Sequence, residues 1–397
     1  MSRLVYLDNN ATTAVAPEVL EAMLPFYRER YGNPSSMHAF GGGLAKDVAH
    51  ARARVAALLN ARDTEILFTG CGTESDNAAI RGVLEAYPDK RHLITSRVEH
   101  PAVLSLCRHL EKRGYAVTYL PVDQEGRLDL EQLRREIRPD TALVSIMYAN
   151  NETGTVFPVQ AVAEIVKAAG SVFHCDAIQA AGKLSLDMER IPADLVSISG
   201  HKLHGPKGVG ALYIRRGTRF VPFLIGGHQE RGRRGGTENV AGIVGLGRAC
   251  ELAVSRRDED VERIASLRDK LEREVLALVP EVSVNGDRAR RLPNTTNLSF
   301  AYVEGEAILL KLADHGICAS SGSACTSGSL EPSHVLRAMG VPFTRIHGSI
   351  RFSFSRYNDD SDVAAVVDVM PVLIAGLREL SPFWGRREQE DTSVCRN

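Results

Sequence analysis

The stretch SVFHCDAIQAAGKLSLDMERIPADLVSISGHK, residues 171–202, decides the fold. It contains two short apolar runs, 172–175 and 195–199, and within three residues each is followed by a charged side chain, Asp176 and Lys202. Apolar runs of this length, separated by turn-forming residues, indicate strands that are buried on both faces. Because ligands bind beyond the carboxyl ends of such strands, we expect Asp176 and Lys202 to face one crevice.

Strand-like and helix-like runs alternate on both sides of this stretch. Helix-like runs begin at Pro17, with Gly32 closing the first, and recur from Thr73 and over 102–112, 130–137 and 159–169. The strand-like runs are 65–69, 92–96, 116–120, 141–148, 171–175, 194–199 and 210–214. Such alternation predicts an α/β fold, with a mostly parallel sheet that is flanked by helices and joined by right-handed crossovers.

The pattern of strand-like and helix-like runs changes near residue 255. A charged run over 255–278 predicts one long exposed helix, and short strand-like runs follow it, such as 297–302 and 349–354. We therefore expect a large domain over 15–255 and a smaller α+β domain. The smaller domain would comprise residues 1–14 and 256–380, and the polar segment 381–397 reads as a flexible tail.

Composition excludes several classes of protein. The 397 residues are 44% hydrophobic, and 48 Lys+Arg against 49 Asp+Glu give a formal charge of −1. That balance supplies no general field for nucleic acid or an anionic membrane. No apolar run is long enough for a membrane span or a signal peptide, so we expect a soluble cytoplasmic protein. The seven cysteines are scattered without a CxxC pair, which argues against a disulfide framework or a structural zinc site.

Two local patterns carry chemistry. A lysine at a dry strand end can have a lowered pKa and act as a Schiff-base nucleophile, and a neighbouring aspartate can pair with a protonated pyridine nitrogen. From these two residues alone, a buried Asp176–Lys202 ion pair is the competing interpretation. The run Gly70-Cys71-Gly72-Thr73-Glu74 joins a strand to a helix N-terminus, so it is either a phosphate cradle or an ordinary structural turn.

Ordered motifs extend this pattern over most of the chain. They are YLDNNATT at 6–13, EHPAV at 99–103, NNETG at 150–154, RGRRGGTEN at 231–239, SGHKLHGPKG at 199–208 and SSGSACTSGS at 320–329. In this order they resemble the NifS/IscS-type cysteine desulfurases, and most closely the nitrogen-fixation type. The resemblance covers residues 4–380 and implies a fold type I enzyme with a seven-stranded sheet, which binds pyridoxal 5'-phosphate.

The resemblance also implies roles for particular residues. Lys202 would hold the cofactor covalently and then act as acid and base at the substrate Cα, while His100 would stack on the ring and help to move protons. Asn151 and Arg351 would bind the carboxylate of L-cysteine. The remaining cofactor contacts would come from Gly72, Thr73, Ser199 and His201 at the phosphate, Asp176 at the pyridine nitrogen, Gln179 at the phenolic oxygen, and Thr237 of the second subunit of a homodimer.

Cys325 is the cysteine that the resemblance marks as reactive. The run 319–329 contains only Ala, Ser, Gly, Thr and this one Cys, so it has little to bury and is expected to be mobile. In isolation such a run is a flexible linker. Together with a cofactor lysine, Cys325 would take sulfur from L-cysteine, leave L-alanine and pass the persulfide to an iron–sulfur scaffold protein, including those that serve nitrogenase. A transient iron–sulfur contact at Cys325 stays open.

Other interpretations also stay open. A selenocysteine lyase would need the long Ser-rich run less, a pyridoxal-phosphate aminotransferase would not need Cys325, and a non-catalytic sulfur carrier would not need Lys202. The spacing His201-x-x-His204 suits a metal, but Lys202 lies between and no third ligand follows nearby, so no resident metal is expected. Cys71 reads as a small packing residue, and the arginines of 231–234 as a contact to the partner subunit or phosphate rather than to RNA.

Overall fold

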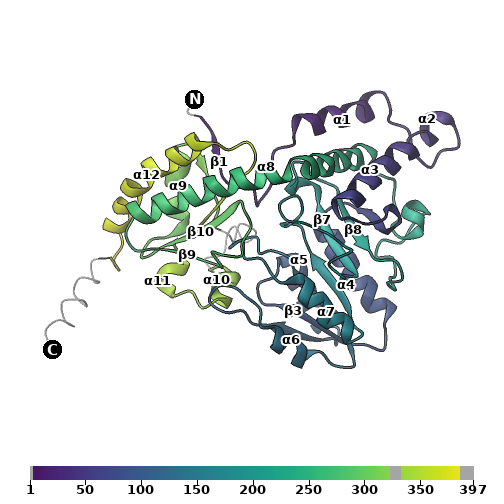
Figure 1. The fold of residues 1–397 in the computed structure, drawn as a ribbon, viewed down its shortest axis with the longest axis horizontal. Helices are drawn as coiled ribbons and strands as arrows, with labels where there is room; N and C mark the ends of the chain where they lie inside the picture. The colour runs from purple at the N-terminus through teal and green to yellow at the C-terminus, as the bar shows by residue number, and fades with distance from the viewer. Residues whose placement is uncertain (1–2, 322–331, 385–397) are drawn as a thin grey trace.

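The computed structural model describes residues 3–321 and 332–384. Its centre is a seven-stranded sheet in the order β2-β8-β7-β6-β5-β3-β4, as Figure 1 shows in part. Every neighbouring pair is parallel except those that involve β8, which runs antiparallel to β2 and β7. The predicted mostly parallel seven-stranded sheet is therefore confirmed. Its strands are β2 Ile66–Thr69, β3 His92–Ser96, β4 Ala116–Leu120, β5 Thr141–Met147, β6 Val172–Asp176, β7 Leu195–Ser199 and β8 Gly210–Ile214.

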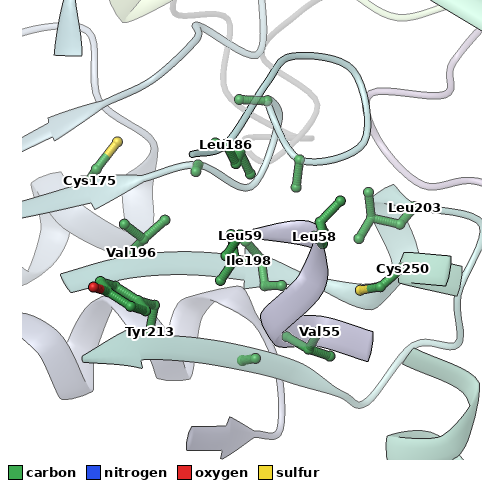
Figure 2. Close-up of a cluster of buried hydrophobic side chains, with 14 of the residues drawn as sticks. Val55, Leu58, Leu59, Cys175, Leu186, Val196, Ile198, Leu203, Tyr213 and Cys250 are labelled. Carbon is green, nitrogen blue, oxygen red and sulfur yellow. The ribbon is translucent and has the colours of Figure 1, made fainter. Parts of the chain in front are cut away.

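Both faces of this sheet are buried, as the apolar runs predict. Val196 and Ile198 of β7 point into one core and Leu195 into the other, because side chains alternate along a strand. Figure 2 shows part of the first core, where Tyr213 of β8 and Val55 lie close to the β7 side chains. The helices of the first core include α1 Pro17–Arg28, α3 Ala45–Leu58 and α7 Val159–Ala168, and those of the second are α4 Gly72–Ala86 and α5 Pro101–Glu111.

Short helices complete the larger part of the chain. They are α2 Ala39–Gly42 and α6 Leu130–Glu136, with 3-10 turns η1 Asp63–Glu65, η2 Gly200–Lys202 and η3 Gln229–Gly232. The first helix ends at Arg28, four residues before the predicted closure at Gly32. None of the helices that the structure describes combines the length and the apolar character needed to cross a membrane.

Two smaller sheets share a core of their own. The strands β10 Thr295–Phe300, β12 Ser349–Ser353 and β9 Val282–Val284 are antiparallel, while β1 Val5–Tyr6 pairs in parallel with β11 Ile317–Cys318. Their core combines Val5 and Leu7 with residues from Ile264 onward. The helices of this part are α9 Gly305–Asp314, α10 His334–Ala338, α11 Phe343–Ile346 and α12 Asp360–Glu379.

One helix, α8, connects the first core of the large sheet with the core of the smaller sheets. The prediction of an exposed helix over 255–278 was wrong in two respects, because α8 spans Val240–Leu278 and buries a stripe of its second half. Ile264, Leu267 and Leu271 recur every three to four residues on that stripe and contact the smaller core, while the first half packs on α3. Charged residues around the stripe hid this periodicity. In Figure 1, α8 runs across both parts of the molecule.

The predicted domain boundary near residue 255 falls inside α8. The division into a large and a small domain stays a prediction. Most of the predicted flexible tail, 381–397, lies outside the described residues. Of the part that is described, the Trp384 ring packs edge-on against Tyr302 at 5.8 Å between centroids, and Arg378 lies over its face at 4.4 Å.

Candidate active site

A cavity of about 380 Å³ lies at the carboxyl ends of β6 and β7. Asp176 ends β6, and Lys202 ends the 3-10 turn that follows β7, so both side chains reach the same cavity. Ten residues singled out from the sequence line it: Gly72, Thr73, His100, Asn151, Asp176, Gln179, Ser199, His201, Lys202 and Arg351. The topology of the sheet brings them together from positions that are up to 279 residues apart in the chain, counted from Gly72 to Arg351.

Two predicted residues are not among the residues that line the cavity in the described part of the chain. Thr237 is exposed and is not among the described residues that line this cavity, as a residue contributed to a second subunit would be. Cys325 lies outside the described residues. Cys71, interpreted above as a packing residue, is half-buried and lines the cavity.

The N-terminus of α4 forms one end of the cavity. Cys71 takes the cap position in an extended conformation, and no described side chain caps the helix there. The N–H groups of the first turn are therefore available to an anion. A Cβ atom on Gly72 would lie 2.2 Å from Ile178 Cδ1, so a larger residue would intrude on this cradle. Glu74 Oε2 accepts a hydrogen bond from the Gly70 N–H at 2.7 Å and braces the turn.

The Ser199 hydroxyl points to the same end. It is buried and makes no hydrogen bond with any residue in the described part of the chain, although a buried hydroxyl normally has a partner. A phosphate oxygen at the cradle would accept its hydrogen. The residues present therefore fit the phosphate of pyridoxal 5'-phosphate.

Removing that hydroxyl is expected to weaken cofactor binding. Ser199→Ala deletes a hydrogen bond to a charged group, so we expect the dissociation constant of pyridoxal 5'-phosphate to rise about tenfold or more. Equilibrium dialysis of cofactor-free protein measures the change, and Ser185→Ala, at an exposed serine, serves as the control. Equal dissociation constants for wild type and Ser199→Ala would show that Ser199 does not contact the phosphate.

Asp176 is the anionic group of the cavity. Its side chain is 5% exposed, and Oδ1 accepts a hydrogen bond from the Ile178 N–H at 3.0 Å. Burial raises the pKa of this carboxyl to about 6, against the opposing effects of that hydrogen bond and the positive charge of Lys202. A cation placed against Asp176 would reverse the shift. A protonated pyridine nitrogen is such a cation, so this end of the cavity also fits the cofactor.

Lys202 is held by the N-terminal segment. Its Nζ donates to the carbonyl oxygens of Asn10 at 2.5 Å and Ala11 at 2.7 Å. The Gln179 amide nitrogen donates to the same Asn10 carbonyl at 2.9 Å. The segment that contains Asn10 and Ala11 thus contributes to the cavity wall, and this contribution was missed from the sequence. Its string of short polar residues was the available signal, but nothing in the sequence places it beside a strand almost 200 residues later.

His100 caps α5 and faces the cavity. Its Nδ1 accepts the Ala102 N–H at 3.1 Å, so the neutral ring carries its hydrogen on Nε2. Burial, followed by the charges of Lys202 and His334, lowers the pKa of His100 to about 4. At neutral pH His100 is therefore uncharged and presents an N–H donor.

The two histidines with metal-like spacing have separate partners. His201 Nδ1 lies 3.2 Å from the Thr12 hydroxyl, and His204 Nδ1 lies 2.9 Å from the Ala14 carbonyl oxygen. No group of His, Cys, Asp and Glu side chains suited to a metal occurs in residues 3–321 and 332–384. Of the arginines in 231–234, Arg234 forms an ion pair with Glu74 of the cradle at 2.9 Å.

A buried carboxyl behind the cavity affects stability. Glu99 accepts hydrogen bonds from the Ser96 hydroxyl at 2.6 Å and the Met147 N–H at 3.1 Å. Burial nevertheless raises the pKa of Glu99 from 4.5 to about 8. Between these two values the folded protein keeps a proton that the unfolded chain has lost, so the free energy of unfolding falls as pH rises.

Glu99→Gln is expected to remove this pH dependence. The amide is neutral at every pH and keeps the shape of the protonated carboxyl. Relative to wild type, the variant should gain about 2 kcal/mol in free energy of unfolding between about pH 6 and pH 8. Urea unfolding of the cofactor-free proteins at these two pH values measures the difference. Parallel losses of stability in both proteins would contradict a protonated Glu99.

Comparison with known proteins agrees with this geometry. The model of the class-V aminotransferase family matches residues 5–366, and the chain belongs to that family. Over 380 residues it is 61% identical to a cysteine desulfurase of Trichormus azollae, which covers 96% of this chain and 95% of the relative. Over 381 residues it is 55% identical to the cysteine desulfurase NifS of Azotobacter vinelandii, with 96% and 95% covered.

A solved structure of a NifS-like protein is also similar. It superimposes with a TM-score of 0.89 at 41% identity and covers 94% of this chain and 100% of its own. Within the class-V family, the chain thus belongs to the group of cysteine desulfurases of the NifS type, as the sequence motifs predict.

Proposed function

We propose that this desulfurase takes sulfur from L-cysteine and releases L-alanine, with Cys325 as the acceptor. The supporting observation is that Lys202, Asp176 and the Gly72 cradle line one cavity at the strand ends. An isolated Asp–Lys ion pair would not need an anion cradle or a buried hydroxyl without a partner beside it. In balanced form, L-cysteine and the Cys325 thiol give L-alanine and a Cys325 persulfide.

The cofactor of the proposal is pyridoxal 5'-phosphate. Its phosphate would be held by Gly72, Thr73, Ser199 and His201, its pyridine nitrogen by Asp176 and its phenolic oxygen by Gln179. When bound, it supplies an electron sink for the bonds broken at the substrate Cα and Cβ.

Lys202 has two tasks in this scheme. Its Nζ would hold the cofactor covalently and, once free, would remove the proton from the substrate Cα. The carbonyls of Asn10 and Ala11 accept hydrogen bonds from Nζ and so limit where it can lie. His100 is uncharged and carries its hydrogen on Nε2. It would stack on the cofactor ring and could donate a proton or a hydrogen bond within the cavity.

Substrate binding uses Arg351 together with Asn151. Arg351 lies on β12, and its planar guanidinium suits a carboxylate. The Cys325 thiolate then attacks the substrate Sγ, so that an S–S bond forms as the substrate C–S bond breaks. Cys325 follows closely on Ser320, which exchanges backbone hydrogen bonds with Arg351 at 2.6 and 3.2 Å. Ser320, close to the end of the described residues at 321, is thus paired through its backbone with the residue that is proposed to bind the carboxylate.

Partners beyond the substrate belong to the same proposal. A homodimer would place Thr237 at the phosphate of the second subunit. Exposed apolar side chains support it, among them Met37 and Phe40 near α2 and Ile225 in the segment before η3. The persulfide would pass to an iron–sulfur scaffold protein, in a nitrogenase assembly role in the cytoplasm.

The experiment combines two readouts on the cofactor-loaded protein. After addition of L-cysteine, we expect stoichiometric alanine release and one additional sulfur on the intact mass of the chain. An aminotransferase would instead require a keto acid, and a selenocysteine lyase would prefer selenocysteine without modifying the chain. A non-catalytic sulfur carrier would neither release alanine nor gain sulfur from L-cysteine alone, so each alternative differs in at least one readout.

A further inference from the structure

The guanidinium of Arg351 is already in contact with a carboxylate of its own chain. Its Nη2 donates to Asp8 Oδ1 at 2.7 Å, and its Nη1 donates to the Asn151 carbonyl oxygen at 2.8 Å. Arg351 is 2% exposed, and its Nε makes no hydrogen bond with any residue that the structure describes. Arg351, the residue proposed to bind the substrate carboxylate, is therefore already paired with Asp8 before any substrate binds.

Asp8 is fixed in this position by the backbone. Leu7 donates its N–H to the Cys318 carbonyl at 2.8 Å and accepts the Ser353 N–H at 2.7 Å, so the segment lies between β11 and β12. A further bridge joins Asp8 itself to Ser353, two residues after Arg351. The strand pairing thus sets Asp8 beside the Arg351 side chain independently of their own ion pair.

Charge explains why a carboxylate belongs there. A guanidinium stays ionised at every physiological pH, and a buried one without a counter-ion is costly. Among the described residues, Asp8 is the acidic side chain that forms an ion pair with Arg351. A second carboxylate entering the cavity must either displace Asp8 or share the guanidinium with it, and like charges held close together repel each other.

We propose that Asp8 is an internal competitor for the substrate carboxylate and thereby determines specificity. The inference rests on the proposed role of Arg351. With Asp8 in place, a simple carboxylate gains little at Arg351. An amino acid, which is also held through its amine, has enough additional binding free energy to displace Asp8. The Nε donor that lacks a partner becomes available to the ligand when the guanidinium turns away from Asp8.

Asp8→Asn isolates the charge. The amide oxygen of asparagine can still accept the Nη2 hydrogen bond, so the orientation of Arg351 is kept while its counter-ion is lost. We expect the dissociation constant of propionate to fall about tenfold or more, because the buried cation now gains its counter-ion from the ligand. Calorimetry of cofactor-loaded protein in low-chloride buffer measures this constant, and L-alanine is titrated in parallel as the amino-acid probe.

Controls separate charge from structure. Asp8→Glu keeps the charge and should leave propionate as weakly bound as in wild type, and Asp140→Asn removes an exposed carboxylate far from the cavity. Asp8→Asn should also melt at a lower temperature than wild type without ligand and regain more of its stability when propionate is added. This second readout serves even where the variant folds poorly.

Two failures are distinguishable. If Arg351→Ala leaves the L-alanine dissociation constant unchanged, the role of Arg351 in the proposed function is wrong. If Arg351→Ala weakens L-alanine binding while Asp8→Asn binds propionate no more tightly than wild type, only the inference about Asp8 is overturned.

Discussion

Lys202→Arg is expected to reduce alanine production from L-cysteine by more than about a thousandfold. The guanidinium can still donate hydrogen bonds to the carbonyls of Asn10 and Ala11 and keeps the positive charge. It cannot lose its proton at neutral pH, so it can neither hold the cofactor covalently nor remove the Cα proton. The variant thus deletes the chemistry of Lys202 and preserves much of its environment.

Two measurements check this expectation. Visible absorbance from the covalent link between cofactor and lysine should disappear in the variant, and alanine release should fall with it. Lys207→Arg, at an exposed lysine of the same motif, is the matched control and should retain both signals. Substantial turnover by Lys202→Arg would exclude Lys202 as the base.

Cys325→Ala is expected to abolish the gain of sulfur on the chain and to lower alanine release by about a hundredfold or more. Without the thiolate, the substrate sulfur has no acceptor and the C–S bond is not broken efficiently. Cofactor absorbance should be unchanged, since Lys202, Asp176 and the cradle are intact. The loss of sulfur transfer with retention of the cofactor distinguishes this variant from Lys202→Arg.

Cys71→Ala is the control for sulfur transfer. Cys71 is half-buried and lines the cavity, so among the described cysteines it is the alternative candidate for the sulfur acceptor. By contrast, burial raises the pKa of Cys107 and Cys250 to about 12, which keeps these thiols protonated. Sulfur that is retained on Cys325→Ala but lost from Cys71→Ala would reassign the acceptor.

The sequence predicted the strands of the large sheet well, because strands buried on both faces appear as short apolar runs. It did not predict that β8 is antiparallel. Only residues 200–209 connect β7 to β8, and a parallel crossover needs a dozen residues or more, so connection length was the usable signal. The beginning of α8 at Val240 was missed because its Gly- and Ala-rich first half lacks a clear amphipathic pattern.

The cavity was predicted more fully than its surroundings. Residues at strand ends, such as Asp176 and Lys202, follow directly from the topology of a parallel sheet. Asp8 and Asn10 do not, because they belong to a segment that reaches the cavity by pairing with strands more than 300 residues later. The pattern of each partner can indicate a strand, as at 349–354, but it does not say which distant segment that strand pairs with.

The length of α8 is expected to make the unfolding of the molecule cooperative. With 39 residues at 1.5 Å each, it forms a rod of about 58 Å whose two halves are anchored in different cores. If one half of α8 unfolded, the core that it covers would lose buried apolar contacts. The remaining half would then begin or end at an uncapped position and would tend to unfold as well. The two parts of the molecule are therefore expected to unfold together. A chain that is cut in the middle of α8 should not give a stably folded fragment on either side.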